Sequence, residues 1–424
     1  MRKITAILGV AVLATAGFIG YALHVDGRGA LDDGAADGPL AVAGTAAERG
    51  RYLAKAADCA ACHTVPNAGD YAGGVPFRMP FGTIYSSNLT PDPGAGIGTL
   101  SDEEFLRAVR SGVGRGGRHL YPAHPYTAYA GMARSDVLAI RAYLASLPAV
   151  AAKIPASALN FPYSQRGLMV LWNALFLDGK RFRPDPARDE AWNRGAYLAT
   201  ALGHCGECHT PRNVAFAVQG GHALTGAVTQ GWKAYDITAS ASGIGAWTDE
   251  ALDQYLTVGH APGRGAATGP MKEVVAFSTS QLTAADRKAL VGYLLGGRPT
   301  GGASPPPVGA VQSSPSGSAS GGIGATLYAG TCAGCHSLDP RAATGYYSNL
   351  ASARTVSDPE GTNILKLLSD GSPHGVAEGP AMPGFQRAYS DTERAALANY
   401  VLSQWGHLLP ALTPRDAMRA RSAE

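Results

Sequence analysis

The pentapeptide Cys-x-x-Cys-His occurs three times in this chain, at residues 59–63, 205–209 and 332–336. It is the attachment signal for a c-type haem, in which both thiols form thioethers and the histidine binds the iron from one side. A single Cys-x-x-Cys can be half of a zinc site or a redox dithiol. Here the three copies use every cysteine of the chain, which indicates three covalent haems. The predicted attachment points are Cys59, Cys62, Cys205, Cys208, Cys332 and Cys335, and the predicted proximal iron ligands are His63, His209 and His336.

Length and charge narrow the possibilities further. A chain of 424 residues predicts about three domains at ~150 residues each. Its 55 glycines fit short helices joined by long loops. The net charge is only +3 and no long basic cluster is present, which argues against a nucleic-acid-binding protein.

The N-terminus has the pattern of an export segment. Arg2 and Lys3 precede an apolar run over residues 4–23, as in a secretory signal peptide. The run is also long enough to span a bilayer as an uncleaved helix, the alternative that we slightly favour. Residues 1–23 are therefore expected to be a signal peptide or membrane anchor, and 24–44 a tether. The positive-inside rule then places the remainder at the periplasmic face of the cytoplasmic membrane.

The chain repeats itself around the haem motifs. Arg49-Gly50-Arg51-Tyr52-Leu53 before the first motif resembles Arg194-Gly195-Ala196-Tyr197-Leu198 before the second. Segments with apolar residues at helical spacing follow each motif, at 136–144, 286–294 and 392–401. Repeated units indicate repeated domains. Each unit has an opening helix, a haem motif, a long irregular loop and a closing helix, which is the plan of a class I cytochrome c domain. The predicted fold is all-α, with three such domains in tandem after the N-terminal helix.

Composition gives the boundaries of these domains. The connecting segment between domains 2 and 3 is rich in Pro, Gly and Ser, which predicts a flexible linker and an independently moving third domain. The predicted parts are domain 1 at 45–150, a connector at 151–190, domain 2 at 191–298, the linker at 299–322, domain 3 at 323–408 and a C-terminal tail at 409–424. The connector contains an apolar stretch, 167–177. It is either a partner- or membrane-facing helix or a helix buried between domains 1 and 2, and we favour the second.

Two methionines are candidates for the sixth iron ligand. Met271 follows the second haem motif and Met382 follows the third. Each lies shortly before a closing helix, the place where class I cytochromes have a methionine sulfur opposite the proximal histidine. The alternative for each is a methionine of the hydrophobic core.

The first domain differs at this position. Ala123-His124-Pro125 corresponds to Ala381-Met382-Pro383, and the spacing from His63 to His124 is nearly that from His209 to Met271. His124 is therefore predicted as the sixth ligand of the first haem. Because methionine ligation raises the reduction potential, a haem with two histidine ligands should have the lowest potential of the three. Met132 and Met79 remain open as alternatives.

Several longer segments carry a family resemblance. Among them are Pro80-Phe81-Gly82-Thr83-Ile84-Tyr85-Ser86-Ser87-Asn88-Leu89-Thr90-Pro91-Asp92, residues 120–126, Trp172-Asn173-Ala174-Leu175-Phe176-Leu177, 192–198 and 259–265. With these segments the chain resembles the three-haem cytochrome c subunits of membrane-bound bacterial dehydrogenases that act on alcohols, gluconate, sorbitol or fructose, and aldehydes. The resemblance covers most of residues 45–408. The family usually has methionine where this chain has His124.

The resemblance implies a role in electron transfer. A partner dehydrogenase subunit of flavin, quinoprotein or molybdenum type would oxidise the substrate, and electrons would pass through three covalently bound haems c to ubiquinone or to a downstream cytochrome or oxidase. The chain itself would not oxidise the substrate, and no catalytic residue is predicted. A free-standing membrane-tethered electron carrier is the alternative. A haem enzyme with an open iron site is disfavoured, because His124, Met271 and Met382 would close all three irons.

Overall fold

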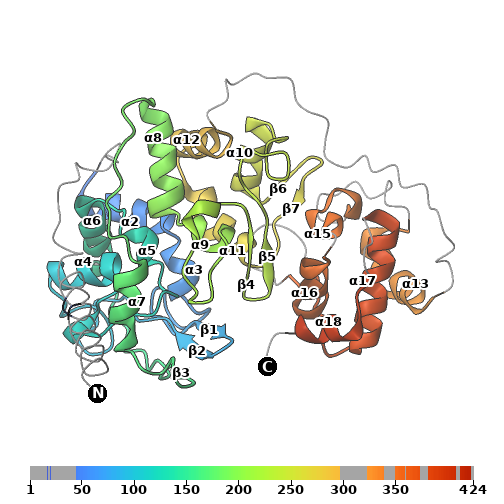
Figure 1. The fold of residues 1–424 in the computed structure, drawn as a ribbon, viewed down its shortest axis with the longest axis horizontal. Coiled ribbons are helices and arrows are strands. Elements are labelled where there is room, and N and C mark those ends of the chain that lie inside the picture. Colours follow the sequence, from blue (N-terminus) through green and yellow to red (C-terminus); the bar gives the residue numbers. More distant parts are fainter. Residues whose placement is uncertain are drawn as a thin grey trace, which may run out of the picture. The chain divides into compact units, whose positions relative to one another are not determined.

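The computed structural model describes residues 17, 20, 44–296, 322–338, 349–358, 360–372, 381–406 and 411–421. Nearly all of the expected N-terminal helix and tether and of the linker at 299–322 lies outside the described residues. In the part of the chain that is described, no helix is both long enough and apolar enough to cross a membrane. The chain forms two compact units, one of residues 1–207 with 213–217 and the other of residues 208–212 with 218–424 (Figure 1).

The first unit is closed by two helices that cross at a glycine. These are α2 (Ala46–Ala56) and α6 (Arg134–Ala145), which confirms the predicted helix at 136–144. A Cβ atom on Gly50 would overlap the carbonyl oxygen of Ala139, so only glycine lets the two backbones come this close. Leu53 and Leu144 bury their side chains, each 1% exposed. Thr45 and Glu48 form a capping box that fixes where α2 begins.

The stretch between these two helices contains more regular structure than the predicted loop. It comprises α3 (Cys59–His63), β1 (Pro76–Met79), β2 (Gly82–Tyr85), α4 (Asp102–Ser111) and α5 (Tyr126–Tyr129). Strands β1 and β2 pair as an antiparallel hairpin, with Pro76 opposite Tyr85 and Met79 opposite Gly82. The prediction of an all-α fold therefore missed short antiparallel sheets, because strands this short leave almost no alternating pattern in the sequence.

The connector packs on the first domain. Strand β3 (Ala158–Leu159) pairs with β2, and helix α7 (Leu168–Phe176) buries Trp172 and Asn173. The indole nitrogen of Trp172 donates to the Ala215 carbonyl at 2.8 Å. Elsewhere on α7, Leu168 and Leu175 are 44% and 61% exposed. Trp172 is thus buried between Tyr126 of the predicted first domain and Ala217 of the predicted second domain, in agreement with the favoured interpretation, while Leu168 and Leu175 stay exposed.

The segment that leads to the second haem motif also belongs to the first unit. It consists of α8 (Glu190–Tyr197) and a π-helical turn at Leu198–Leu202. The hydroxyl of Tyr197 donates to Asp136 at 2.7 Å and accepts from the backbone N–H of Ala133 at 3.2 Å. Helix α9 (Gly206–His209) then carries the second motif.

The second unit repeats the order of the first. Its elements are β4 (Ala227–Thr229), β5 (Trp232–Ala234), α10 (Asp249–Val258), β6 (His260–Ala261), β7 (Gly265–Ala266), α11 (Pro270–Phe277) and α12 (Ala284–Leu294). Strands β4 and β5 pair antiparallel, as do β6 and β7. Helix α12 confirms the predicted helix at 286–294. Short 3-10 helices of this unit occur at Gly220–His222, Thr279–Gln281 and Leu350–Ser352, and the first unit has one at Arg115–Gly117.

The third haem motif begins another helical region of this unit. Its elements are α13 (Ile323–Leu327), a π-helical turn at Tyr328–Cys332, α14 (Ala333–His336), α15 (Arg354–Ser357), α16 (Thr362–Asp370), α17 (Asp391–Trp405) and α18 (Pro414–Arg419). Helix α17 contains the predicted helix at 392–401. A Cβ on Gly324 would overlap the Ala396 carbonyl oxygen, so α13 and α17 cross as α2 and α6 do.

The predicted C-terminal tail is folded over residues 411–421. Ala417 of α18 is fully buried, and the Arg421 guanidinium binds both carboxylate oxygens of Asp391 at 2.9 and 2.7 Å. The side chain of Asn399 in α17 also bonds the backbone N–H and carbonyl of Leu412, each at 2.8 Å. This part of the predicted tail therefore belongs to the third domain.

Candidate functional site

The three haem motifs lie on or directly before short helices, and their cysteines form no disulfides. Cys59 and Cys62 belong to α3, Cys208 to α9 and Cys335 to α14, and all six cysteines of the chain are free of disulfides. Cysteines three residues apart on a helix lie on one face, so both thiols of a motif can reach one flat ligand. Burial raises the pKa of Cys59 to about 12 and that of Cys332 to about 11, and the neighbouring Asp58 and Cys335 act in the same direction. These two thiols are thus protonated and poor metal ligands at neutral pH.

The histidines of the first two motifs are held in the same way. The Nδ1–H of His63 donates to the Ser87 carbonyl at 2.7 Å, and the Nδ1–H of His209 donates to the Tyr235 carbonyl at 2.6 Å. Burial lowers the pKa of both imidazoles, and the carbonyl hydrogen bonds act in the opposite direction. Both rings are therefore neutral at pH 7, with Nδ1 occupied and the lone pair of Nε2 available to a metal.

The loop after each of these histidines is built on a second shared hydrogen bond. The Thr64 hydroxyl accepts from the N–H of Tyr71 at 3.0 Å, and the Thr210 hydroxyl accepts from the N–H of Leu224 at 3.1 Å. Tyr71 and Leu224 both have left-handed backbones, with φ of 59° and 63°. A left-handed residue other than glycine is costly unless its surroundings hold it.

The strand that supplies the accepting carbonyl ends in a matching turn. Oδ1 of Asn88 accepts from the N–H and hydroxyl of Thr90 at 2.8 and 2.7 Å. Oδ1 of Asp236 accepts from the same groups of Thr238 at the same two distances. The turn follows directly after Ser87 in one domain and after Tyr235 in the other, so it fixes the carbonyl that holds the histidine. The internal repeat thus extends to individual hydrogen bonds.

The position of His124 matches that of Met271 in the structure. Helix α4 ends at Gly112 and α10 ends at Gly259, both in the left-handed conformation. His124 follows Gly112 at the same spacing at which Met271 follows Gly259. In both domains the chain first pairs with itself just after the glycine, at Val113 with His119 and at His260 with Ala266.

The environment of His124 resembles that of His63. One ring nitrogen bonds the backbone of Ala108, which leaves the other nitrogen available. Burial and the neighbouring His63 and His204 rings lower the pKa of His124 to about 3, so the ring is neutral. Met132, the first alternative, is 1% exposed and presents no accessible face to a ligand, whereas His124 and His63 are half-buried. Met79, the other alternative, ends strand β1.

The third motif has a tyrosine contact beside its histidine. His336 ends α14 and is half-buried, and the carbonyl of the next residue, Ser337, accepts from the Tyr328 hydroxyl at 2.7 Å. Met382 pairs with Ser372 just after α16, and its side chain packs against the core of the third domain. Met382 thus follows Gly371, the glycine that ends α16, as Met271 follows Gly259.

These residues fit a covalent haem. Each motif offers two thiols three residues apart, in or directly before a short helix, and an imidazole directly after them, the donor set of haem c. In the first two domains the Nδ1–carbonyl bond leaves Nε2 as the metal-binding nitrogen. Two half-buried thioethers and one half-buried imidazole stand at the corresponding later position, namely Met271, Met382 and His124.

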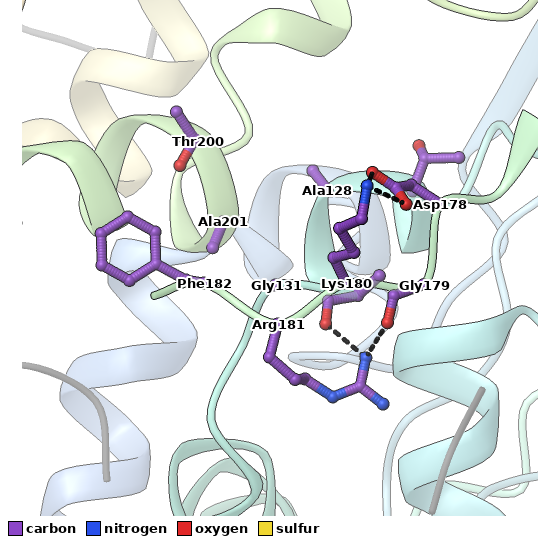
Figure 2. A pocket seen from close by; sticks show the side chains of 11 residues that line it. Ala128, Gly131, Asp178, Gly179, Lys180, Arg181, Phe182, Thr200 and Ala201 are labelled. Carbon is purple, nitrogen blue, oxygen red and sulfur yellow. Dashed lines mark hydrogen bonds and ion pairs between the residues drawn. The ribbon is translucent and has the colours of Figure 1, made fainter. Parts of the chain in front are cut away.

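A separate small pocket lies in the first unit where residues 178–182 pass between α5 and the turn at 198–202 (Figure 2). Its volume is about 220 Å³, below the ~300 Å³ at which sites for drug-sized ligands begin. Lys180 pairs with Asp178, and Arg181 donates to the carbonyls of Ala130 and Gly179 at 2.7 and 2.8 Å (Figure 2). The charged side chains that line this pocket thus bond neighbouring groups of the same chain.

The segment before the second motif makes contacts that the sequence did not predict. His204 packs edge-on against Tyr129, with ring centroids 5.5 Å apart, and hydrogen-bonds the backbone of Ala57. The Tyr129 hydroxyl donates to the same Ala57 carbonyl at 2.8 Å. Thr127 donates to Glu207 at 2.5 Å. The segment that leads into the second motif is therefore held against the start of the first.

Comparison with known proteins agrees with this arrangement. The family model for cytochrome c matches residues 47–148 and 323–405. The chain is 40% identical over 373 residues to a subunit of the nicotinate dehydrogenase of Pseudomonas putida, across 86% of this chain but only 31% of that protein. It is 36% identical to the fructose dehydrogenase cytochrome subunit of Gluconobacter japonicus, across 88% of this chain and 81% of that one. It is 34% identical to the gluconate 2-dehydrogenase cytochrome c subunit of Pantoea cypripedii, across 89% and 90%.

The chain spans less than a third of the first of these relatives and most of the other two. Identity above 30% over most of both chains, together with the haem motifs, shows that this chain belongs to the cytochrome c subunits of dehydrogenase complexes, which carry covalently bound haem c and accept electrons from a dehydrogenase.

Proposed function

We propose that this chain carries three haems c and passes electrons from the catalytic subunit of a dehydrogenase complex to ubiquinone or a downstream cytochrome. The observation that carries the proposal is the pair of matched histidine bonds, from His63 to Ser87 and from His209 to Tyr235. A hydrogen bond from the second ring nitrogen to a backbone carbonyl is the usual partner of a metal-binding histidine. When bound, haem c supplies one-electron oxidation and reduction at the iron.

In this proposal each haem has a proximal and a distal ligand from its own domain. The proximal ligands are His63, His209 and His336, and the distal ligands are His124, Met271 and Met382. Their matched positions after Gly112 and Gly259 support His124 and Met271. The low pKa of His124 keeps its ring neutral, as a metal ligand must be.

The surrounding residues exclude water from the first site. Tyr126 is fully buried, and its hydroxyl donates to Asn173 of the connector at 2.8 Å. Tyr71 and Tyr129 are 5% and 6% exposed. A dry site of this kind holds solvent reorganisation low, and it sets the potential through burial and ligand type.

The remaining parts of the proposal concern place and partner. The charged and apolar N-terminal pattern supports a signal peptide or anchor at 1–23, which would put the haem domains at the periplasmic face of the cytoplasmic membrane. The relatives are named as subunits of nicotinate, fructose and gluconate dehydrogenases, which supports a flavin, quinoprotein or molybdenum dehydrogenase as the partner.

Purification from membranes tests the partner. We expect the chain, solubilised in mild detergent and captured through a tag, to hold three haems by pyridine haemochrome assay and to retain a dehydrogenase subunit in equal amount. A chain that comes down alone with three haems contradicts the complex and favours a free-standing electron carrier. Fewer than three haems contradicts the cofactor assignment.

Substitution tests the unusual ligand. We expect His124→Ala to change the ferric low-spin spectrum of one haem, because it removes a strong-field nitrogen donor. Met132→Leu is the matched control and should leave the spectrum unchanged. An unchanged spectrum in His124→Ala, with a changed one in Met132→Leu, would make Met132 the ligand.

A further inference from the structure

One strand of the second unit, β5, is followed directly by the residue that holds His209 and contacts the segment that leads into Met271. The carbonyl of Tyr235, the residue directly after β5, accepts the Nδ1–H of His209 at 2.6 Å. At the other end of β5, Trp232 lies against Gly269, where a Cβ atom would come within 2.6 Å of the indole. Gly269 precedes Met271 by two residues and begins α11. Any shift of β5 therefore acts on the proximal and the distal side together.

The middle of this strand is held by a residue of the third domain. Oδ1 of Asn363 in α16 accepts from the backbone N–H of Lys233 at 2.8 Å, and its Nδ2 donates to the Lys233 carbonyl at 2.9 Å. The same Nδ2 lies 3.0 Å from the Tyr235 hydroxyl. The amide bonds the strand as a neighbouring strand would. Asn363 is 4% exposed, so water cannot replace these bonds cheaply.

Further contacts surround the hydrogen bonds of Asn363. The Lys233 ammonium lies 2.9 Å from Asp358 and 3.1 Å from Glu360. Burial opposes the charge of Lys233, but its bonds to these two carboxylates outweigh that effect and raise its pKa. The Arg354 guanidinium lies over the Tyr235 ring, 5.0 Å from its centroid. At Gly265 of β7, a Cβ atom would come within 2.9 Å of the Ala353 backbone, so the two segments touch directly.

We propose that Asn363 is a positioning residue for the second haem: by fixing β5, the third domain sets the hydrogen bond on His209 and the placement of Met271, and so its seating tunes the reduction potential of that haem. The inference rests on the assignment of His209 and Met271 as ligands. Hydrogen bonding to the outer nitrogen of a histidine ligand raises its basicity, and axial-ligand environment is one of the main determinants of haem potential. The prediction of an independently moving third domain does not take account of these contacts.

The test compares potentials in the full haem-loaded chain. Asn363→Ala removes all three bonds. Asn363→Asp keeps the size of the side chain and an acceptor for the Lys233 N–H, but it has no donor for the Lys233 carbonyl or the Tyr235 hydroxyl. Glu360→Gln is the matched control, because Glu360 lies at the same interface with a side chain 64% exposed. The second haem is identified as the one whose spectrum changes in Met271→Ala.

We expect both Asn363 variants to retain three haems and to shift the electron-transfer equilibrium constant of the second haem by about threefold or more, because outer-sphere partners of a ligand histidine have effects of this kind. The first and third haems and the Glu360→Gln chain should keep wild-type potentials. An unchanged second-haem potential in both variants, or an equal shift of all three haems, overturns the proposal. If Met271→Ala changes no haem, the ligand assignment itself is wrong, and this inference fails with it.

Discussion

The first and second haem-binding segments share one set of hydrogen bonds around the histidine, called here the frame, but differ in the segment that packs on it. Both use a histidine bonded to a strand carbonyl, a threonine that caps a left-handed residue and an Asx turn after the strand. The two segments differ two residues before the carbonyl that accepts from the histidine. In the first, the backbone N–H of Tyr85 bonds Ser157 of the connector at 3.4 Å. In the second, the backbone N–H of Lys233 bonds Asn363 of the third domain at 2.8 Å. The hydrogen bonds around the histidine are therefore the same in both segments, but the strand is bonded by the connector in the first and by the third domain in the second.

The distal side carries the second difference. The first domain has His124 where the second has Met271, at the same spacing from the glycine that ends the preceding helix. A repeated frame with different ligands lets related domains have different potentials without a change of fold. Under the proposed assignment, the shared residues would hold the haem and the residues that differ would tune its potential.

The largest expected effect comes from separating the two helices that cross in the first domain. Gly50→Ala places a Cβ onto the Ala139 carbonyl, so α2 and α6 must move apart, and we expect a loss of about 3 kcal/mol or more in the free energy of unfolding. Gly292→Ala in α12 is the control, because a Cβ there meets nothing within 4 Å and alanine favours helix. Denaturant unfolding of the haem-loaded chain measures both. Equal effects would show that α2 and α6 do not meet as described.

The second-largest expected effect comes from giving the first domain the methionine that the second domain has at the matching position. In His124→Met we expect the potential of the first haem to rise by about 60 mV or more, one tenfold step for a one-electron couple, because thioether ligation favours the reduced iron. Spectroelectrochemical titration measures it, with Met132→Leu as the control. A first haem that already has the highest potential in the wild type would contradict the histidine assignment.

A smaller effect tests whether the two frames are equivalent. Thr64→Val and Thr210→Val keep the shape of the side chain but leave the N–H of Tyr71 or Leu224 without its acceptor. Each should lower the free energy of unfolding by about 1–3 kcal/mol, the cost of an unsatisfied buried donor. Thr64→Ser and Thr210→Ser retain the hydroxyl and serve as controls. A cost confined to one domain would show that the shared hydrogen bond matters in that domain only.

The smallest effect depends on pH. Hydrogen bonds from Ser101 hold the pKa of Glu104 at the start of α4 below its usual value, whereas the matching helix α10 begins at Thr248 with Ala251 in place of the glutamate. The folded pKa is the lower one, so this contribution is present above the unfolded pKa and is lost as the pH falls through the folded value. We expect amide exchange in the first turn of α4 to rise between about pH 5 and 3 relative to α10. Glu104→Gln, which keeps the capping geometry, should remove that dependence.

The sequence predicted the parts that side chains encode. The motifs predict the thiols and the proximal histidines, and helical spacing correctly predicted α6, α12 and α17. The carbonyls of Ser87 and Tyr235 escaped prediction, because a backbone acceptor has no side-chain signature. Asn363 escaped because its partner Lys233 is 130 residues away in the chain. The segment of α18 was expected to be a tail because a helix of six residues shows little periodicity.

The docking of α18 has a consequence for how the protein is made. Synthesis delivers the chain from its N-terminus, so α2 and α6 can pair once α6 has emerged, and the connector and the following segment complete the first unit by residue 217. The third domain needs residues well beyond its closing helix α17, because Ala417 is fully buried and Arg421 pairs with Asp391 at the start of that helix. Helix α17 therefore stays partly uncovered until residue 421 has emerged, and the region of the third haem motif is the last of the three to be shielded from proteases.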